Sequence, residues 1–283
     1  MVQGGVTVSL IRIQQLSVSY GTPPRPVLSD IDLNIEDGEF VCLLGQTGCG
    51  KSTLLRLVLG SEHPTQGHIL IDGVEHHQPD RTRGYVPQKY SLFPDKTVLG
   101  NITFGPEVSG FGLLGHLLPR FYRRRREFRE KAYDYLRRIG LHESDAGKYP
   151  DQLSGGMQQR VAIAQALMTE PRILLMDEAF SALDPGTRKE MQRLIRGLSQ
   201  DLGITVLFVT HSIQEAIQIG SRVVVLARES ASNGSSIVLD CDPRSGDSGL
   251  LARQLLDIME TSKETPSLNL AAVEVGDTQF AGF

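Results

Sequence analysis

The sequence has few cysteines and no long apolar run, and each absence excludes a class of protein. Cys42, Cys49 and Cys241 are its three cysteines among 283 residues. Their odd number and spacing fit neither a zinc site nor a disulfide framework, so we expect free thiols in a reducing cytosol. No window offers the roughly 18 consecutive apolar residues of a membrane span. If the protein works at a membrane, another chain must supply the span.

The N-terminus and the charge balance exclude two further classes. The opening residues, MVQGGVTVSLIRIQQL, contain no basic stretch followed by an apolar core and a small-residue cleavage site, so we expect no secretory signal. The net charge of -4 argues against a general affinity for nucleic acid. We therefore expect no nucleic-acid partner. A chain of this length can bury a sizeable core without disulfides.

The first third of the chain is predicted to be β-rich around a single βα unit. Residues 11–20 alternate apolar and polar side chains, as a half-buried strand does. Residues 27–45 read as two strands joined by a turn at Asp37 and Gly38, and a helix is expected from about Lys51. Residues 67–75 predict a strand with an Asp-Gly turn.

The rest of the chain is predicted to be a helical insertion followed by a return to α/β structure. Residues 98–166 have helical character, with Gly140 as a C-cap. Two short apolar runs, 172–177 and 204–211, flank a predicted helix at about 186–202, which indicates parallel buried strands. We expect an edge strand at 237–240, a short helix at 250–259 and a poorly ordered end from Thr261.

Residues 45–53, GQTGCGKST, form a glycine-rich stretch between an apolar strand and a predicted helix. Gly45, Gly50, Lys51 and Ser52 match the pattern G-x-x-x-x-G-K-[ST] in full. Glycines let the backbone curl closely around a triphosphate, and the helix N-terminus favours its negative charge. We expect Lys51 to reach the β- and γ-phosphates, Ser52 to bind Mg²⁺, and Thr53 to cap the helix or contact the α-phosphate. The alternative, a glycine-rich turn without a ligand, is disfavoured by the strand–loop–helix context.

Two acidic residues and a histidine follow two of the later apolar strands. The run ILLMDE ends in Asp177 and Glu178, and VLFVTH ends in His211. An aspartate at the end of a buried strand can hold the shell of Mg²⁺, and Glu178 could polarise an attacking water. We expect the strand before His211 to lie beside the strand that ends in Asp177. This places His211 at the γ-phosphate or the water, with a structural histidine as the alternative.

A second glycine-bearing turn lies in LSGGMQQR, residues 153–160. It places Ser154, Gly155 and Gly156 directly before a predicted helix. Such a turn can bind an anion, and an N-capped helix with a flexible start is the alternative. One chain with two phosphate-type turns and a single lysine-bearing loop indicates that the second turn completes a site elsewhere.

These motifs closely resemble those of the ATP-binding cassette (ABC) ATPases of membrane transporters. The resemblance runs from about Ile11 to Ala227 and includes, in the family's order, GQTGCGKST, VPQ, LSGGMQQR, ILLMDE, SALD and VTH. It implies an α/β fold with a P-loop NTPase core of ABC type, an N-terminal antiparallel β subdomain and an inserted α-helical subdomain. The implied boundaries are 8–240 for the ATPase domain, about 95–165 for the helical insertion and 241–283 for a short tail, partly helical or disordered.

The resemblance also implies roles for individual residues. Tyr20 falls where the family has an aromatic that stacks on adenine, with a core or surface tyrosine as the alternative. Gln88 matches the glutamine that joins metal and water to the helical subdomain. Ser154 and Gly156 match the signature turn that contacts ATP held by a second copy, and Asp184 matches the loop that communicates across that dimer.

The implied cofactors are ATP and Mg²⁺. The implied catalytic residues are Glu178, His211 and Gln88, and the implied metal ligands are Ser52, Gln88 and Asp177. The implied nucleotide-binding residues are Tyr20, Gly45, Gln46, Thr47, Gly48, Cys49, Gly50, Lys51, Ser52, Thr53, Ser154, Gly155, Gly156 and Asp184.

The motif sequences are most similar to those of bacterial importers of the nitrate/sulfonate/taurine and glycine-betaine types, and the first group is favoured. The chain departs from that group at Ser212, where Asp is frequent, and at Gln165, where Arg is frequent. A helical stretch longer than is common there carries Arg123 to Arg126. We interpret this basic run as a solvated helical face, with anionic lipid headgroups or the permease as alternative contacts.

The function implied by the resemblance is an energy-coupling ATPase of an importer, peripheral at the cytoplasmic face of the inner membrane. The implied partners are a second copy, transmembrane permease subunits and, indirectly, a periplasmic solute-binding protein. An exporter cassette for lipids or drugs is the alternative, and a neighbouring gene for a binding protein would discriminate between them. A non-transport ABC protein is disfavoured, because residues 53–153 contain neither heptads nor cysteine pairs. The transported solute cannot be inferred, since the cassette does not touch it.

Overall fold

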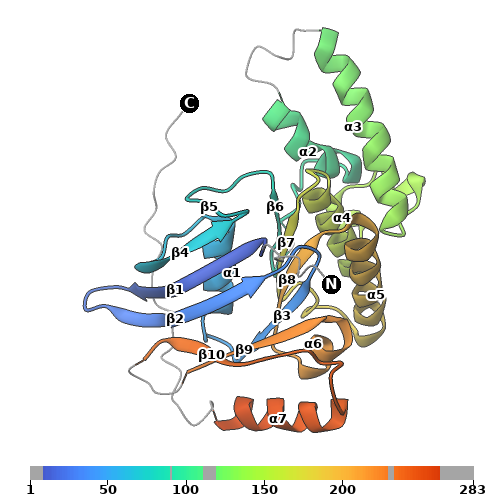
Figure 1. Ribbon diagram of the computed structural model, residues 1–283. Coiled ribbons are helices and arrows are strands. Elements are labelled where there is room, and N and C mark those ends of the chain that lie inside the picture. The colour runs from blue at the N-terminus through green and yellow to red at the C-terminus, as the bar shows by residue number, and fades with distance from the viewer. Residues whose placement is uncertain (1–8, 90, 111–118, 229–232, 262–283) are drawn as a thin grey trace, which may run out of the picture.

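The computed structural model describes residues 9–89, 91–110, 119–228 and 233–261. Its centre is a ten-stranded sheet with the strand order β5-β4-β1-β2-β10-β9-β3-β8-β7-β6 (Figure 1). The strands are β1 Ile11–Tyr20, β2 Arg25–Ile35, β3 Phe40–Gly45, β4 Gln66–Ile71, β5 Val74–Glu75, β6 Arg83–Val86, β7 Ile173–Asp177, β8 Thr205–Thr210, β9 Arg222–Arg228 and β10 Ser235–Cys241.

Seven helices and two short 3-10 turns surround the sheet in the described part of the chain. They are α1 Lys51–Leu59, α2 Val98–Gly110, α3 Pro119–Arg138, η2 Glu143–Asp145, η3 Pro150–Gln152, α4 Gly155–Leu167, α5 Pro185–Leu202, α6 Ile213–Ile219 and α7 Ser248–Thr261. Helices α2 and α3 extend away from the sheet at one end, and α7 lies at the opposite end beside β9 and β10 (Figure 1). None of the described helices is both long and apolar enough to cross a bilayer.

The sheet combines an antiparallel and a parallel part. Strands β1, β2, β4 and β5 pair antiparallel with their neighbours in that group. Strands β9, β3, β8, β7 and β6 form a parallel series. The predicted parallel strands, and the predicted neighbours β7 and β8, are therefore confirmed.

The expectation of an edge strand at 237–240 is wrong. Strand β10 lies between β2 and β9, pairing antiparallel with β9 and meeting β2 at Ser235 and Leu28. The single pair with β2 lies before the predicted segment, and Ile237, Leu239 and Asp240 pair with β9 alone. The segment is therefore interior in the order of the strands but has hydrogen-bond partners on one side.

Alternate side chains of the central strands enter two separate cores. On β3, Phe40, Cys42 and Leu44 join the core formed with the later helices. Val41 and Leu43 join the core formed with α1 and the antiparallel strands. The period of two along a strand explains the division, and coverage of both faces explains why β3 is a continuous apolar run. The sheet is thus fixed from both sides where its parallel strands end.

Candidate active site

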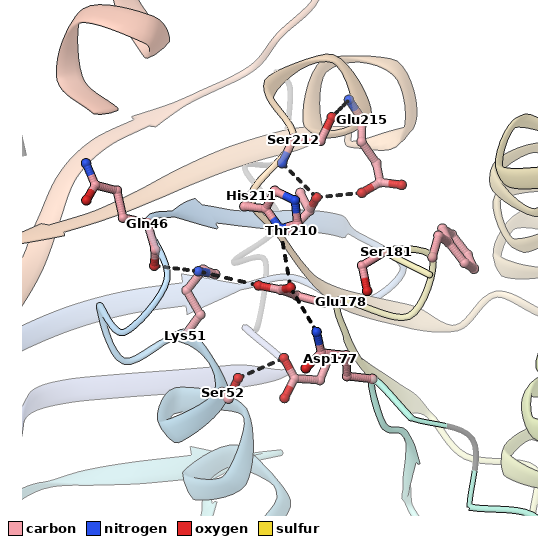
Figure 2. Close-up of polar contacts among 12 residues, drawn as sticks. Gln46, Lys51, Ser52, Asp177, Glu178, Ser181, Thr210, His211, Ser212 and Glu215 are labelled. Carbon is pink, nitrogen blue, oxygen red and sulfur yellow. Dashed lines mark hydrogen bonds and ion pairs between the residues drawn. The ribbon is translucent and has the colours of Figure 1, made fainter. Parts of the chain in front are cut away.

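Three neighbouring parallel strands position the predicted site residues at one edge of the sheet. Strand β3 leads through the phosphate loop to Lys51, β7 ends at Asp177, and His211 follows β8. These strands lie in the order β3-β8-β7, so their carboxyl ends are adjacent. Crevices at the carboxyl ends of parallel strands are the usual binding places of α/β sheets. Figure 2 shows Lys51, Asp177, Glu178 and His211 gathered at this edge.

The phosphate loop needs the first and last glycines of its motif for steric reasons. A Cβ atom at Gly45 would lie 2.5 Å from the carbonyl oxygen of Leu226. Gly50 has φ +93°, and its Cβ would lie 2.7 Å from a methyl group of Leu28. Gly50 is also the N-cap of α1 and has no side chain to cap the first turn. The first amide groups of α1 therefore form the kind of donor set that binds a phosphate, which fits the predicted triphosphate.

Lys51 is the buried cation of the loop. Its side chain is 4% exposed, and Nζ donates to the carbonyl oxygens of Gly45 at 2.9 Å and Gln46 at 2.7 Å. Nζ also lies 3.8 Å from Oε1 of Glu178. A buried ammonium group requires such partners. They hold its charge beside the N-terminus of α1, where a bound phosphate would meet it.

Ser52 and Asp177 form a pair of oxygen ligands. Ser52 Oγ donates to Asp177 Oδ1 at 2.9 Å. Burial raises the pKa of Asp177 and the negative charge of Glu178 adds to this, while the hydrogen bond from Ser52 opposes it. Tyr85 lies on the other side, with its hydroxyl 3.5 Å from Asp177 Oδ2, and burial raises the pKa of Tyr85 to about 12. Hydroxyl and carboxylate oxygens suit Mg²⁺, so this pair fits the predicted metal.

Glu178 contacts three other predicted residues of the site. Its carboxylate lies 3.8 Å from Lys51 Nζ, accepts a hydrogen bond of 3.3 Å from Gln88 Nε2, and lies 3.3 Å from His211 Nδ1. Its backbone has φ 42°, in the left-handed region that non-glycine residues rarely adopt. The Glu178 amide donates to the carbonyl oxygen of Val209 at 3.1 Å, which ties this conformation to β8. Such strain is found at functional sites held by their surroundings.

The second glycine-bearing turn is built differently. Ser154 is the N-cap of α4 and accepts from the amide of Met157 at 3.3 Å. A Cβ at Gly156 would lie 2.7 Å from Cγ2 of Thr187, so the starts of α4 and α5 touch there. Asp184 caps α5, accepting from the amides of Gly186 and Thr187 at 3.1 Å each. Among the described residues, no hydrogen bond or ion pair joins the turn 154–156 to the phosphate loop.

Comparison with known proteins shows the family of the chain. The model of the family described as ABC transporter matches residues 28–181. The chain belongs to the ABC transporter family. It is 45% identical over 199 residues to an uncharacterized ABC transporter ATP-binding protein of Methanocaldococcus jannaschii, covering 70% of each chain. Its fold and its ATPase class are those predicted from the motifs.

Two relatives with named solutes are longer than this cassette. The sulfate/thiosulfate import ATP-binding protein CysA of Shigella flexneri is 44% identical over 223 residues, which are 77% of this chain and 58% of CysA. The spermidine/putrescine import ATP-binding protein PotA of Legionella pneumophila is 43% identical over 223 residues, covering 78% of this chain and 57% of PotA. The cassette therefore spans less than two thirds of the length of these relatives.

Solved structures show the same fold. A dimeric, post-hydrolysis structure of the ATP-binding cassette MJ0796 bound to ADP and Pi has a TM-score of 0.68 and 31% identity, and covers 83% of this chain and 100% of that chain. The structure of cbiO1 from Clostridium perfringens, part of an ABC transporter complex, has a TM-score of 0.72 and 26% identity, and covers 90% of this chain and 98% of that chain.

Other predicted residues of the cassette lie around the loop rather than at Glu178. Tyr20 ends β1, is 41% exposed, and its hydroxyl donates to Glu62. Glu62 also accepts from Arg56 of α1, so Tyr20 lies beside the helix that begins at the phosphate loop. The side chain of Gln46 points away from Lys51 (Figure 2) and donates to the carbonyl oxygen of Met259 on α7. The remaining loop positions are the exposed Thr47, Gly48 with φ 83°, and the buried Cys49 and Thr53.

Sequence reasoning missed residues that support the site from outside the motifs. Arg188 of α5 donates hydrogen bonds of 3.0 to 3.2 Å to the carbonyl oxygens of Ser181 and Leu183 in the SALD segment and of Phe180 directly before it. Glu215 of α6 is a buried carboxylate behind His211. An arginine or a glutamate on a helix carries no motif of its own. The one signal in the sequence was the position of Arg188, one helical turn after the capping Asp184.

Proposed function

We propose that this ABC cassette is the ATP-hydrolysing, energy-coupling subunit of an importer. The observation that carries the proposal is the convergence of Lys51, Gln88 and His211 on the carboxylate of Glu178, next to the Ser52–Asp177 pair. A module that only bound nucleotide would not need this arrangement of acid, amide and imidazole. The import direction is supported by relatives such as CysA and PotA, whose names describe import.

Different residues of the chain would bind the phosphates, hold the metal and orient the attacking water. Lys51 and the first amides of α1 would bind the β- and γ-phosphates of ATP. Ser52, Asp177 and Gln88 would hold Mg²⁺, which when bound neutralises charge on the phosphate oxygens. Glu178 would orient the attacking water and take its proton on a carboxylate oxygen. Gln88 and His211 hold that carboxylate by contacts of 3.3 Å each, and His211 would face the γ-phosphate.

The second glycine-bearing turn would serve a second copy of the chain. We propose that Ser154, Gly155 and Gly156 contact ATP held by that copy and that Asp184 faces the same interface. The turn 154–156 has backbone donors and a hydroxyl but no cation of its own. The dimer of MJ0796 supports this arrangement by similarity. Closing of two copies over two nucleotides would then move the transmembrane permease subunits, with a periplasmic solute-binding protein as an indirect partner.

The finer assignments belong to this proposal. We place the cassette at the cytoplasmic face of the inner membrane, with 8–240 as the ATPase domain, a helical insertion at about 95–165 and a tail at 241–283. The subgroup of nitrate/sulfonate/taurine-type importers remains a prediction from motif wording, whereas the relatives cited above have sulfate/thiosulfate and spermidine/putrescine in their names.

The basic run on α3 supports the interpretation of a solvated face. Arg123 and Arg126 lie 3.8 and 3.1 Å from glutamates one turn further along α3, and Arg125 lies 3.5 Å from Glu107 of α2. Ion pairs at this spacing are common on exposed helices. We therefore propose no lipid or permease contact for these arginines.

The proposal is tested by reconstitution. The cassette is coexpressed with neighbouring permease genes, captured by a tag, and incorporated into vesicles with ATP on the cassette side. We expect an integral membrane protein in the captured complex and solute uptake that stops when Lys51→Ala replaces the wild type. Solute movement in the opposite direction would identify an exporter, and capture of no membrane protein under conditions that preserve ATP hydrolysis would contradict the coupling role.

A further inference from the structure

A buried carboxylate lies directly behind His211 and is not part of the predicted site. Glu215 is 7% exposed and belongs to α6, the helix that begins after His211. Its Oε2 accepts from the hydroxyl of Thr210 at 2.5 Å, and its Oε1 accepts from Nε2 of Gln192 on α5 at 2.9 Å. Figure 2 shows Thr210, Ser212 and Glu215 as one cluster beside His211. A buried carboxylate with two side-chain donors is stable only while both remain in place.

The directions of these hydrogen bonds form a closed chain around the histidine. A carboxylate only accepts, so the single proton of the Thr210 hydroxyl must point to Glu215. The Thr210 oxygen is then free to accept from the amide of Ser212 at 3.0 Å. The Ser212 hydroxyl in turn accepts from the amide of Glu215 at 3.3 Å. The carboxylate thus fixes residue 210 directly and residue 212 through the Thr210 oxygen, whereas the bond between Ser212 and the Glu215 amide is a helix cap made by the backbone.

Within the described residues, the side chain of His211 itself is held by a single polar contact. The side chain is 53% exposed, and Nδ1 lies 3.3 Å from Oε2 of Glu178. An exposed imidazole with one long contact depends on its backbone for its orientation. We propose that Glu215 is the positioning residue of His211, acting through Thr210 and Ser212 to aim the imidazole at Glu178. This inference rests on the proposed hydrolytic function of the site.

Gln192 extends the same arrangement to a second element. It lies on α5, the helix that Asp184 caps, and its amide donates to the carboxylate that fixes the His211 turn. The helix that starts at the predicted dimer loop therefore shares a buried hydrogen bond with the turn that carries the histidine. A displacement of α5 would change the position of His211 through this bond.

Replacement of Glu215 and Thr210 tests the proposal by turnover. Glu215→Gln removes the charge and converts one acceptor into a donor, so Thr210 and Gln192 can both be bonded only if the Gln192 amide turns over. Thr210→Val removes the hydroxyl at similar shape. We expect each to lower kcat about 10- to 100-fold, with KM for ATP little changed, because misplacement of a catalytic group by about 1 Å costs on this order. Thr210→Ser keeps the hydroxyl and should retain the wild-type kcat. Melting temperatures identify any variant that fails to fold, in which case the other variant decides the question.

A double-mutant cycle separates positioning from a general structural effect. If Glu215 acts through His211, Glu215→Gln should lower kcat no further in a His211→Ala background. Additive losses in kcat, or wild-type kcat in folded Glu215→Gln and Thr210→Val, would overturn the proposal.

A measurement that needs no turnover keeps this inference separate from the proposed function. In protein with ¹³C-labelled histidine, the imidazole signal of residue 211 is assigned as the one lost in His211→Ala. We expect Glu215→Gln and Thr210→Val to lower its order parameter, and Thr210→Ser to leave it unchanged. An unchanged order parameter in both folded variants would refute positioning by Glu215. A wild-type protein without ATPase activity would refute the proposed function and leave this result to stand.

Discussion

The two glycine-bearing turns of the cassette both precede a helix, yet their surroundings differ in charge and burial. In the phosphate loop, Lys51 is 4% exposed and bonded to loop carbonyls, and Ser52 is bonded to Asp177. In the second turn, Ser154 is exposed and caps its own helix, and Gly156 packs against Thr187. The first turn is surrounded by side chains that can carry out chemistry, and the second offers only small groups and backbone.

This difference fits the different tasks that we propose for the two turns. The phosphate loop lies at the carboxyl ends of strands β3, β7 and β8, where a cation, an oxygen pair and an acid meet within one chain. The second turn lies at the starts of α4 and α5, beside a capping aspartate. Changes at the first turn should therefore affect each copy alone, and changes at the second should affect paired copies.

The largest effect is expected from removing the acid on the phosphate-loop side. Glu178→Gln cannot take a proton from water, so kcat should fall by a factor of about 10² to 10⁴ while ATP still binds and the paired state accumulates. Phosphate release and size-exclusion chromatography with ATP measure the two parts. Glu130→Gln on α3, an exposed change of the same kind, should leave both unchanged. Wild-type turnover in Glu178→Gln would exclude Glu178 as the base.

The next effect is expected at the buried cation. Lys51→Ala removes a charged donor to phosphate, so ATP affinity should fall about 10- to 100-fold, the equivalent of one charge-assisted hydrogen bond. Titration calorimetry on the separated copy measures the dissociation constant. Lys131→Ala, which removes a lysine paired with Glu170, serves as the control. An undiminished affinity would argue against the phosphate-loop assignment.

A smaller effect should distinguish the second turn from the first. In Gly156→Ala the new Cβ would lie 2.7 Å from Cγ2 of Thr187, so the starts of α4 and α5 must shift apart. We expect kcat to fall about 10-fold, as for a displaced positioning element, with ATP affinity of the separated copy unchanged. Thr187→Ser in the same chain lacks Cγ2 and should restore kcat. An equal loss in affinity would show that the two turns are not separate in function.

The smallest expected effect is on the stability of the fold, which the buried Asp177 lowers. Burial raises the pKa of Asp177, so its ionisation opposes folding, and Asp177→Asn should raise Tm by about 2 °C at neutral pH while reducing Mg²⁺-dependent turnover. The gain should be complete above the raised pKa and vanish toward about pH 3, below the ordinary aspartate pKa of about 3.9, where Asp177 is protonated in both states. Calorimetric scans at about pH 8 and about pH 3 measure this difference. A gain independent of pH would assign it to packing.

The sequence predicted those parts of the cassette in which local pattern determines the outcome. Continuous apolar runs predicted β7 and β8, and the glycine pattern predicted where α1 begins at Lys51. The interior place of β10, the contact of Gly156 with Thr187 and the left-handed backbone of Glu178 depend on residues distant in the chain. Arg188 and Glu215 were missed for the same reason. The spacing of apolar residues in a helix predicts which positions are buried, but it does not identify the partner of a charged side chain. The roles of the individual site residues stay predictions until the variants above are measured.

The contact between α7 and the phosphate loop makes the end of this helix a natural place for a spectroscopic reporter. Gln46 of the loop donates to the carbonyl oxygen of Met259, 213 residues later, and the next residue, Glu260, is exposed. Cys42 and Cys49 are buried, and burial raises the pKa of both thiols, so neither competes well for a thiol-reactive dye. With the half-buried Cys241 replaced by serine, Glu260→Cys would give a single labelling site next to the loop. A dye there would signal nucleotide arrival without touching a residue that binds it.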